Sequence, residues 1–273
     1  TGPGVKHLSP EDLVVLHWRK GIGIESETPK YKWGDQALNA GWVTTFNRHA
    51  IVSENRCTKV PGTTDPDIAA LFGCAVTTGF GVIENNAKVK LGESVVVYGA
   101  GGIGLNIVQA AALVSAWPII SVDRFDSRLD LARQMGATHC INSKEENAEI
   151  AIQKALAGQE LDVFIDNTGS TQIIELGYKI TQRNGRIILV GVPHHRSNVN
   201  LNSLPLHFGK QLTGSQGGEA HPHEDIPRYL RLQQLGILNL QQLVSAHYPL
   251  EQINDAITSM RECGTPGRVM IRF

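Results

Sequence analysis

The sequence predicts an α/β fold in which a doubly wound parallel sheet is flanked on both sides by pieces of a second, β-rich domain. Between residues 94 and 190, short apolar runs and helical periods alternate, with linkers of only a few residues. This alternation is typical of right-handed βαβ crossovers. The flanking residues lack it. We therefore expect one domain at 76–218, interrupting another that consists of residues 1–75 and 219–273.

Length, charge and cysteine content limit the function classes. A chain of 273 residues can bury a substantial core. Its 25 Lys and Arg against 26 Asp and Glu give a net charge of −1, so charge favours neither nucleic acid nor an anionic membrane as a partner. The longest apolar stretch, 108–120, is interrupted by polar residues and is too short to span a bilayer. Four cysteines without a CxxC pair indicate a reducing compartment, and we expect a cytoplasmic protein.

The middle third begins with the clearest strand. Residues 94–98 are mostly β-branched and apolar, as expected of a strand buried on both faces. Glycine-rich residues 99–104 lead from this strand into a helical period at 103–114. Pro118 ends that helix, because proline cannot continue a helix interior. A second strand follows at 119–122.

The same reasoning predicts the remaining elements. In the middle third we expect helices at 127–135, 147–157 and 171–181, and strands near 138–141, at 162–166 and at 186–190. In the flanks we expect β-like runs at 13–17 and 50–53, helices at 65–71, 224–235 and 250–261, and a closing strand at 268–273. Alternation at Val199 and Leu201 makes the segment 197–208 β-like, and the family resemblance described below implies an edge strand there.

A glycine motif carries the main functional prediction. Gly99, Gly101 and Gly104 form GxGxxG directly after a strand and at the start of a helix, and Asp123 ends the next strand. In this context the first glycine permits a tight turn, the second lets the backbone approach a pyrophosphate, and the third allows close packing of helix on strand. The helix N-terminus offers amide groups to the anion. The alternative is a glycine-rich turn that binds nothing.

The charge of Asp123 favours NAD over NADP. At the end of its strand the carboxylate is placed to accept hydrogen bonds from the hydroxyls of an adenosine ribose. A 2′-phosphate would bring about two negative charges close to it, a repulsion that NAD avoids. Arg124 would offset part of that repulsion.

An ordered set of segments resembles the zinc-dependent alcohol dehydrogenases of the medium-chain dehydrogenase/reductase superfamily. Near the N-terminus these are GPGVKHLSPEDLVV at 2–15, with Glu11 where the family usually has Gly, and LFGCAVTTGFGV at 71–82. VVVYGAGGIG, SVD, GATHCIN, DNTG, GRIILVGVP, SQGG and GRVMIRF then follow in the family's order. The resemblance implies a Rossmann-type domain and parts of a β-rich, GroES-like catalytic domain.

The resemblance also implies roles for individual residues. The pyrophosphate would lie on Gly99, Gly101, Gly102, Ile103, Gly104 and Arg268, and the adenosine ribose beside Asp123 and Arg128. Val190 and Val192 would present backbone groups to the nicotinamide carboxamide, and Thr78 would pack on its ring as a residue of the catalytic site. Cys74 would be one of three ligands of a catalytic zinc. The family reaction is hydride transfer between an alcohol or aldehyde and NAD, in a homodimer or homotetramer that pairs edge strands.

Departures from the family pattern concern zinc. The other two family ligands, a Cys and a His followed by Glu, lie before the segment with which this chain begins, so we expect an N-terminally incomplete member whose parent enzyme holds zinc. Residues 19–41 contain no Cys, which excludes the family's four-Cys structural zinc. Packing of Trp18, Trp33 and Trp42 is our preferred replacement, with an anion- or sugar-binding loop as the alternative.

Two other functions stay open at this stage. One is a zinc-independent, quinone-reductase-like enzyme of the same superfamily, in which Cys74 is a small buried apolar residue. The other is an NAD-binding module without catalysis. The His pairs at 194–195 and 221–223 are interpreted as surface residues rather than metal ligands. Cys57 and Cys140 are expected to be packing residues, and Cys263 an exposed thiol without a role.

Overall fold

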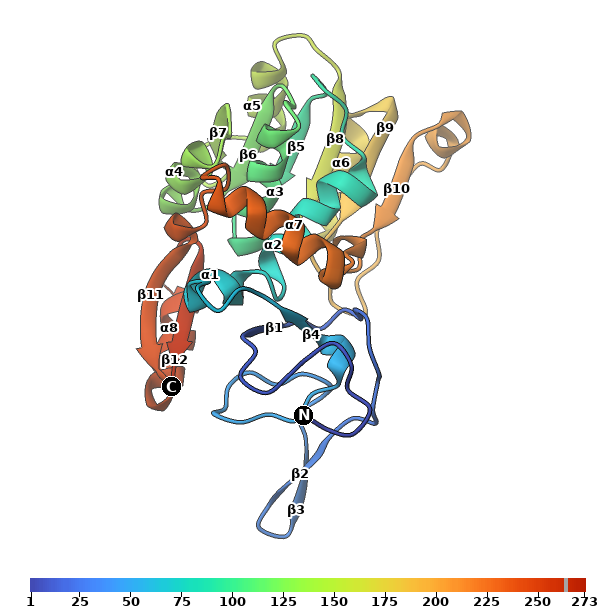
Figure 1. Cartoon of the computed structure of the whole chain (residues 1–273). Coiled ribbons are helices and arrows are strands. Elements are labelled where there is room, and N and C mark those ends of the chain that lie inside the picture. The colour runs from blue at the N-terminus through green and yellow to red at the C-terminus, as the bar shows by residue number, and fades with distance from the viewer. Residues whose placement is uncertain (263–264) are drawn as a thin grey trace. The chain divides into compact units, whose positions relative to one another are not determined.

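A computed structural model describes residues 1–262 and 265–273, and its contacts divide the chain into two compact units (Figure 1). The first unit comprises Thr1–Thr77, Ala220–Met260 and Val269–Phe273, and the second comprises Thr78–Glu219 and Arg261–Arg268. The chain passes from the first unit to the second after residue 77 and returns after residue 219. Residues 261–268 group with the second unit. Cys263 lies outside the described residues.

The second unit is built on a six-stranded parallel sheet, which confirms the predicted fold class. Its strands are β5 (Val95–Tyr98), β6 (Ile119–Asp123), β7 (His139–Asn142), β8 (Leu161–Asp166), β9 (Thr181–Leu189) and β10 (Gln211–Gly214). Their order in the sheet is β10-β9-β8-β5-β6-β7, and every pair is parallel (Figure 1). The order reverses between β5 and β8, which makes their carboxyl ends the topological switch point of a doubly wound sheet.

Helices connect these strands close to the predicted positions. They are α2 (Ala75–Gly81), which leads into this unit, the π-helix η2 (Val82–Ala87), α3 (Gly102–Leu113), α4 (Asp126–Gln134), α5 (Ala148–Leu156), α6 (Thr171–Ile180) and the short η3 (Leu204–Phe208) and η4 (Gly217–Glu219). The largest difference is β9, which begins at Thr181 rather than at residue 186, because Thr181 already pairs with Leu161 of β8.

The predicted edge strand within 197–208 is wrong. Backbone groups of this segment bond to side chains of α6 instead of to a strand. The amide of Asn200 donates to Glu175 over 2.8 Å, and the hydroxyl of Tyr178 donates to the carbonyl of Asn202 over 2.8 Å. The edge of the sheet is β10, whose residues 211–214 pair with β9.

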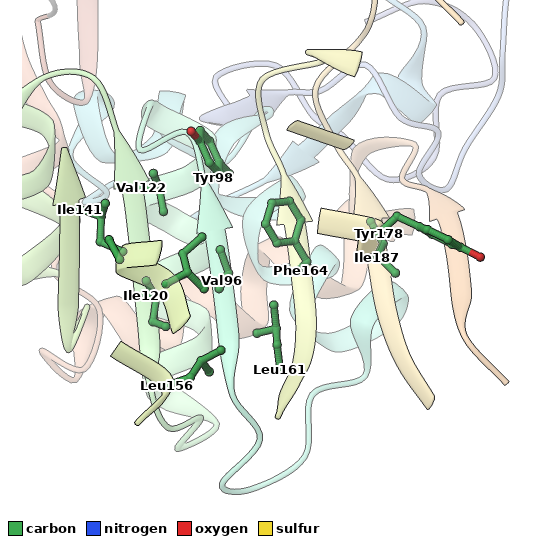
Figure 2. Packing of buried hydrophobic residues seen from close by; sticks show 12 residues of the cluster. Val96, Tyr98, Ile120, Val122, Ile141, Leu156, Leu161, Phe164, Tyr178 and Ile187 are labelled. Carbon is green, nitrogen blue, oxygen red and sulfur yellow. The ribbon is translucent and has the colours of Figure 1, made fainter. Parts of the chain in front are cut away.

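Apolar side chains fill the space between the sheet and its helices. Figure 2 shows the cluster on one face, where Val96, Ile120 and Phe164 from three adjacent strands meet Leu156 of α5 and Tyr178 of α6. The neighbouring strand residues that point the other way are buried as well. Sheets covered on both faces produce near-continuous apolar strands, which explains why the sequence pattern was readable.

The first unit contains short two-stranded sheets instead of one large sheet. β1 (Val14–Leu16) pairs with β4 (Cys57–Lys59), β2 (Lys30–Trp33) with β3 (Gln36–Asn39), and β11 (Val244–Pro249) with β12 (Arg268–Arg272). The helices are α1 (Pro66–Leu71), α7 (Pro222–Gln234), α8 (Ile253–Glu262) and the short η1 (Glu54–Arg56), η5 (Gln241–Leu243) and η6 (Leu250–Gln252). Among the described residues, no helix is long and apolar enough to cross a membrane.

The expected strand at 50–53 is also wrong, because side chains satisfy its backbone. The amide of Ile51 donates to the hydroxyl of Tyr31 over 3.1 Å. The hydroxyl of Ser53 accepts from the amide of Ser26 over 3.0 Å. A strand does form a few residues later, as β4.

Polar contacts, and not packed tryptophans, hold residues 17–56 in place. Trp18, Trp33 and Trp42 are 42%, 74% and 52% exposed, so the packing interpretation is wrong. The buried carboxylate of Glu54 accepts hydrogen bonds from the amides of Lys6, His7 and Ile24 over 2.7, 2.6 and 3.0 Å. These amides lower the pKa of Glu54 to about 2.

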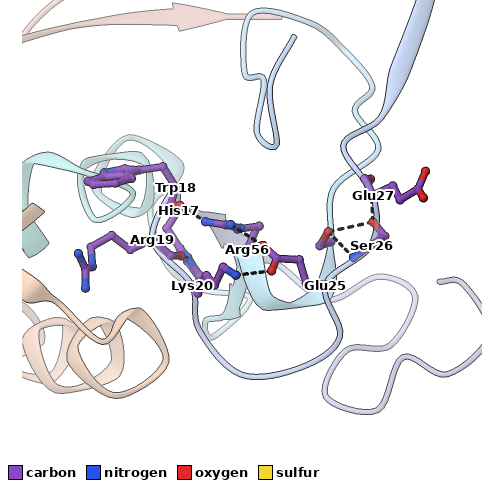
Figure 3. A network of polar contacts seen from close by, with 9 residues as sticks. His17, Trp18, Arg19, Lys20, Glu25, Ser26, Glu27 and Arg56 are labelled. Atoms are coloured by element: carbon purple, nitrogen blue, oxygen red, sulfur yellow. Dashed lines mark hydrogen bonds and ion pairs between the residues drawn. The ribbon is translucent and has the colours of Figure 1, made fainter. Parts of the chain in front are cut away.

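Arg56 supplies the second part of this polar network (Figure 3). Its buried guanidinium bonds the carbonyl of Trp18 and pairs with Glu25 at 2.7 Å, and Lys20 also pairs with Glu25. It also lies 5.1 Å from the ring centre of Trp42. The carboxylate of Glu54 and the guanidinium of Arg56 therefore stabilise this part of the chain.

Candidate functional site

A cleft of about 490 Å³ lies in the second unit at the switch point of the sheet. It is formed at the carboxyl ends of β5, β6 and β8, where ligands of open α/β sheets bind. The residues that line it are Tyr98, Gly99, Gly101, Val122, Asp123, Arg124, Phe125, Arg128, Ser143, Asn167, Thr168, Ser170 and Ile173. Four of the predicted cofactor residues, Gly99, Gly101, Asp123 and Arg128, are therefore brought together.

The three motif glycines occupy different environments. Gly99 has φ +101°, a conformation that side chains disfavour, at the turn after β5. A Cβ on Gly104 would overlap the carbonyl oxygen of Gly99, so only glycine lets α3 approach the strand this closely. A Cβ on Gly101 would meet nothing within 4 Å, so this glycine leaves an open space at the cleft.

The N-terminus of α3 has an unusual supply of amide groups. The first amides of a helix have no partner inside the helix, and the N-cap of α3 is Gly101, which has no side chain to cap them. Gly102, Ile103 and Gly104 form its first turn. A Cβ on Gly102 would overlap the guanidinium of Arg268, so this half-buried arginine lies against the same turn. The amides of the first turn of α3 and the guanidinium of Arg268 thus lie at the same turn.

Asp123 is bound to backbone amides and is only 6% exposed. Its Oδ2 accepts from the amide of Ala100 over 2.7 Å, and its Oδ1 accepts from the amides of Arg124 and Phe125 over 2.7 and 3.2 Å. A carboxylate offers about four acceptor positions. Three of these positions are used, so Asp123 can accept about one further hydrogen bond. The motif predicts two, one from each ribose hydroxyl.

Cations surround the same end of the cleft. Arg128 lies 3.8 Å from Asp123 Oδ2, and its guanidinium is 4.8 Å from the ring centre of Phe125. The ammonium of Lys144 lies 4.4 Å from that ring. Two cations therefore contact the ring of Phe125, an arrangement that the sequence did not reveal because Lys144 follows a different strand.

A further wall of the cleft follows β8. The side-chain amide of Asn167 donates to the carbonyl of Gly99 over 3.2 Å, and Thr168 and Ser170 line the cleft. Sequence reasoning assigned no role to these residues. The signal was available, since Asp166 ends its strand as Asp123 ends β6, and both strand ends meet at one edge of a parallel sheet.

Val190, Val192 and Thr78 do not line the described cleft. Val190 follows β9, and its amide donates to the carbonyl of Asp166 over 2.8 Å. Val192 is 91% exposed, while its carbonyl oxygen lies against Gly169. Thr78 is buried in α2, next to Gly79, where a Cβ would run into Asn106 of α3.

The described residues hold no group of three or more His, Cys, Asp or Glu side chains able to share a metal ion. Cys74 is exposed, so its interpretation as a buried apolar residue is wrong. Burial raises the pKa of Cys57 to about 11 and raises that of Cys140. Both thiols are half-buried, as packing residues are. His194 and His195 are exposed, with ring centres 4.4 Å apart.

The strand order and the glycine loop at the switch point define a Rossmann-type α/β protein. Residues 102–234 match the family model described as zinc-binding dehydrogenase. An NDMA-dependent alcohol dehydrogenase of Amycolatopsis methanolica is 32% identical, over 96% of this chain and 78% of the relative. The chain belongs to the zinc-type alcohol dehydrogenase family of the medium-chain dehydrogenase/reductase superfamily, a family of oxidoreductases.

Two further relatives give the same result. An S-(hydroxymethyl)glutathione dehydrogenase of Synechocystis is 28% identical, over 91% of this chain and 69% of the relative. The solved structure of benzyl alcohol dehydrogenase from Acinetobacter calcoaceticus superposes with a TM-score of 0.76 and 34% identity. That comparison covers 81% of this chain, and the chain spans 61% of the solved chain.

Proposed function

We propose that the second unit binds NAD and that the protein transfers a hydride between an alcohol and NAD. One observation carries the proposal: the amide-bearing turn of α3, Arg268 and the carboxylate of Asp123 are arranged at the switch point of one sheet. The space beside Gly101, which any side chain would fill, fits the approach of a pyrophosphate to the backbone. The dehydrogenase names of the relatives support the reaction class.

Each of the chain's own groups has a defined task in this proposal. The amides of Gly102, Ile103 and Gly104, with Arg268, hold the pyrophosphate. Asp123 accepts a ribose hydroxyl, and its negative charge disfavours a 2′-phosphate. Val190 and Val192 orient the carboxamide through their backbone groups, and Thr78 packs on the nicotinamide ring. When bound, NAD supplies the carbon that accepts or returns the hydride.

Zinc does not fit the described residues by themselves. A catalytic zinc needs three protein ligands, and Cys74 is the one residue that the family pattern provides here. We derive no step through a metal. A second candidate function is an NAD-binding chain without alcohol turnover.

Titration of the purified protein with NADH tests the binding proposal. We expect saturable enhancement of NADH fluorescence with a dissociation constant between about 1 µM and 1 mM, and a higher melting temperature. Gly101→Val should abolish both effects, because the side chain fills the open space. Gly62→Val is the matched control, since a Cβ there also meets nothing within 4 Å. Unchanged fluorescence and melting temperature in the unsubstituted protein would refute NAD binding.

Turnover separates the two candidate functions. The protein that binds NADH is assayed with NAD and a panel of primary alcohols, and with NADH and the corresponding aldehydes. A change in the absorbance of NADH, as it is formed or consumed, supports dehydrogenase activity. Saturable NADH binding without turnover, with and without added zinc, supports the binding module.

Assembly and location are proposed from the edge of the sheet and from the cysteine content. We propose a homodimer or homotetramer that pairs β10, because this strand is the edge of the sheet and an edge presents unpaired backbone groups. We also propose a cytoplasmic location, from the four cysteines without disulfide-type spacing. Size-exclusion chromatography with light scattering measures the oligomeric state.

A further inference from the structure

Three cations gather at the end of the cleft that contains Asp123. Arg124 and Arg128 line the cleft together with Asp123. The ammonium of Lys144 lies 4.4 Å from the centre of the Phe125 ring, which also lines the cleft. The guanidinium of Arg128 lies 4.8 Å from the same ring centre. The adenine and the ribose of NAD carry no charge, so NAD brings no counter-charge to these cations.

The neighbouring carboxylates do not line the cleft. That of Asp126 accepts a hydrogen bond from the side chain of Asn142 over 2.9 Å. Glu146 lines a separate cavity formed by residues of β7 and α5, and Glu145 is exposed. Among the described residues that line the cleft, Asp123 is therefore the one with a carboxylate.

Arg128 has hydrogen-bonding capacity left. Its Nη1 lies 3.8 Å from Oδ2 of Asp123, which is too long for a hydrogen bond. Its Nε is buried and has no hydrogen-bond partner among the described residues. A buried donor without a partner is costly, and it indicates that a ligand, an ion or a water molecule completes the site. A guanidinium presents its donors in a fork that matches the oxygens of a phosphate.

A phosphate at the 2′ position of the adenosine ribose would supply the missing negative charge. Such a group carries about two negative charges at neutral pH. It would lie beside Arg128, because Arg128 is next to the carboxylate that is placed to hold this ribose. Asp123 repels the phosphate, but three backbone amides already bond its carboxylate. The attraction of three cations therefore opposes the repulsion of one partly neutralised carboxylate.

We propose that the cleft accepts the 2′-phosphate of NADP at Arg124, Arg128 and Lys144, so that the dissociation constant of NADPH lies within about tenfold of that of NADH. Asp123 still favours NADH, but the preference is small. The inference rests on the proposed dinucleotide binding and widens its range of cofactors. It gives Lys144 a role that depends on the phosphate, since this lysine contacts NADP and not NAD.

Parallel titrations with NADH and NADPH, followed by cofactor fluorescence, test the proposal. Lys144→Gln should raise the dissociation constant of NADPH by about fivefold, the effect of one exposed ion pair, and that of NADH by less than about twofold. Lys154→Gln is the matched control, because it removes the same charge from an exposed lysine that lines the separate cavity. We expect it to change neither dissociation constant.

A second pair of ligands removes the nicotinamide half from the comparison. Adenosine 2′,5′-bisphosphate and adenosine 5′-phosphate differ only in the 2′-phosphate, and both are measured by displacement of bound NADH. Lys144→Gln should weaken the bisphosphate and spare the monophosphate. Added salt should weaken NADPH binding more steeply than NADH binding, because the additional contacts join exposed charges.

The outcomes separate the phosphate site from the proposed function. A dissociation constant of NADPH more than about tenfold above that of NADH overturns the phosphate site. An equal effect of Lys144→Gln on both cofactors, or no effect on either, overturns the role of Lys144. Failure of the unsubstituted protein to bind either cofactor overturns the proposed function instead.

Discussion

The sheet core of the second unit and residues 17–56 of the first are held together by different physical forces. In the core, apolar side chains from adjacent strands are buried on both faces, and most of them are fully inaccessible (Figure 2). In residues 17–56, the carboxylate of Glu54 and the guanidinium of Arg56 bond backbone groups far apart in the sequence. Figure 3 shows the contacts of Arg56. Apolar burial is non-directional and scales with area. A polar network depends on each of its partners.

This difference determines how each region tolerates change. A core accepts another apolar residue of similar volume at small cost. A buried polar network does not, because removing one member leaves its partners unsatisfied.

Phe164→Ala should have the largest effect on stability. Phe164 is fully buried in β8, and α6 approaches its ring at Gly177. Loss of the ring leaves a cavity that costs about 3–5 kcal/mol. Urea unfolding followed by circular dichroism measures this change. Leu113→Ala, at a residue 40% exposed, is the control, and an equal loss there would contradict the assignment of the core.

Gly104→Ala should destabilise the second unit by about 1–3 kcal/mol, the usual cost of overpacking. The added methyl overlaps the carbonyl oxygen of Gly99 and forces α3 away from β5. Gly101→Ala should leave the unfolding midpoint nearly unchanged, because its Cβ meets nothing within 4 Å. The same urea experiment compares them. Equal midpoints for the two variants would show that α3 does not depend on this close approach.

Glu54→Gln should lower the melting temperature by about 5 °C, as expected for the loss of one buried polar contact in a chain of this size. The carboxamide directs an NH₂ group at backbone amides that need an acceptor. Differential scanning fluorimetry measures the shift. Glu27→Gln, on an exposed side chain of the same segment, should leave the melting temperature unchanged.

Acid should destabilise the polar network around Glu54. The pKa of Glu54 is lowered from 4.5 to about 2, so the folded state binds its proton less readily than the unfolded chain. Its stabilising contribution is complete above pH 4.5 and is lost as the pH falls toward 2. Fluorescence of Trp18 and Trp42 should report the transition. In Glu54→Gln the corresponding part of the pH dependence should be missing, and its persistence would assign it to another group.

Lys179→Ala should have the smallest effect. Lys179 pairs with Glu149 at 2.8 Å, but its side chain is 69% exposed. Exposed ion pairs contribute about 0–1 kcal/mol. We expect an unfolding midpoint within the error of the unsubstituted protein. A loss comparable to that of Glu54→Gln would show that surface and buried polar contacts do not differ here as proposed.

The candidate site was partly predictable from the sequence. Gly99, Gly101 and Asp123 were found because a strand, a glycine turn, a helix and a second strand follow one another locally. Asn167, which lines the cleft, and Lys144, which contacts the ring of Phe125, were missed because their positions depend on strand order and not on neighbours in the chain. Asp166 ends a strand in the same way as Asp123, but its partners show that it holds loops instead of facing the cleft.

The order of residues alone was enough to infer the parallel sheet, its helices and the glycine turn, because burial on both faces imposes an apolar pattern that can be read within a few residues. The folded contacts were needed to show how residues 17–56 are held, which strand forms the sheet edge and what Asp166 binds. Glu54 accepts hydrogen bonds from amides 30 to 48 residues away. In the segment 197–208, the backbone bonds to a side chain of α6 instead of to a neighbouring strand. Directional contacts between distant residues leave no periodic trace in the chain, because each depends on a single pair of groups rather than on a repeated face.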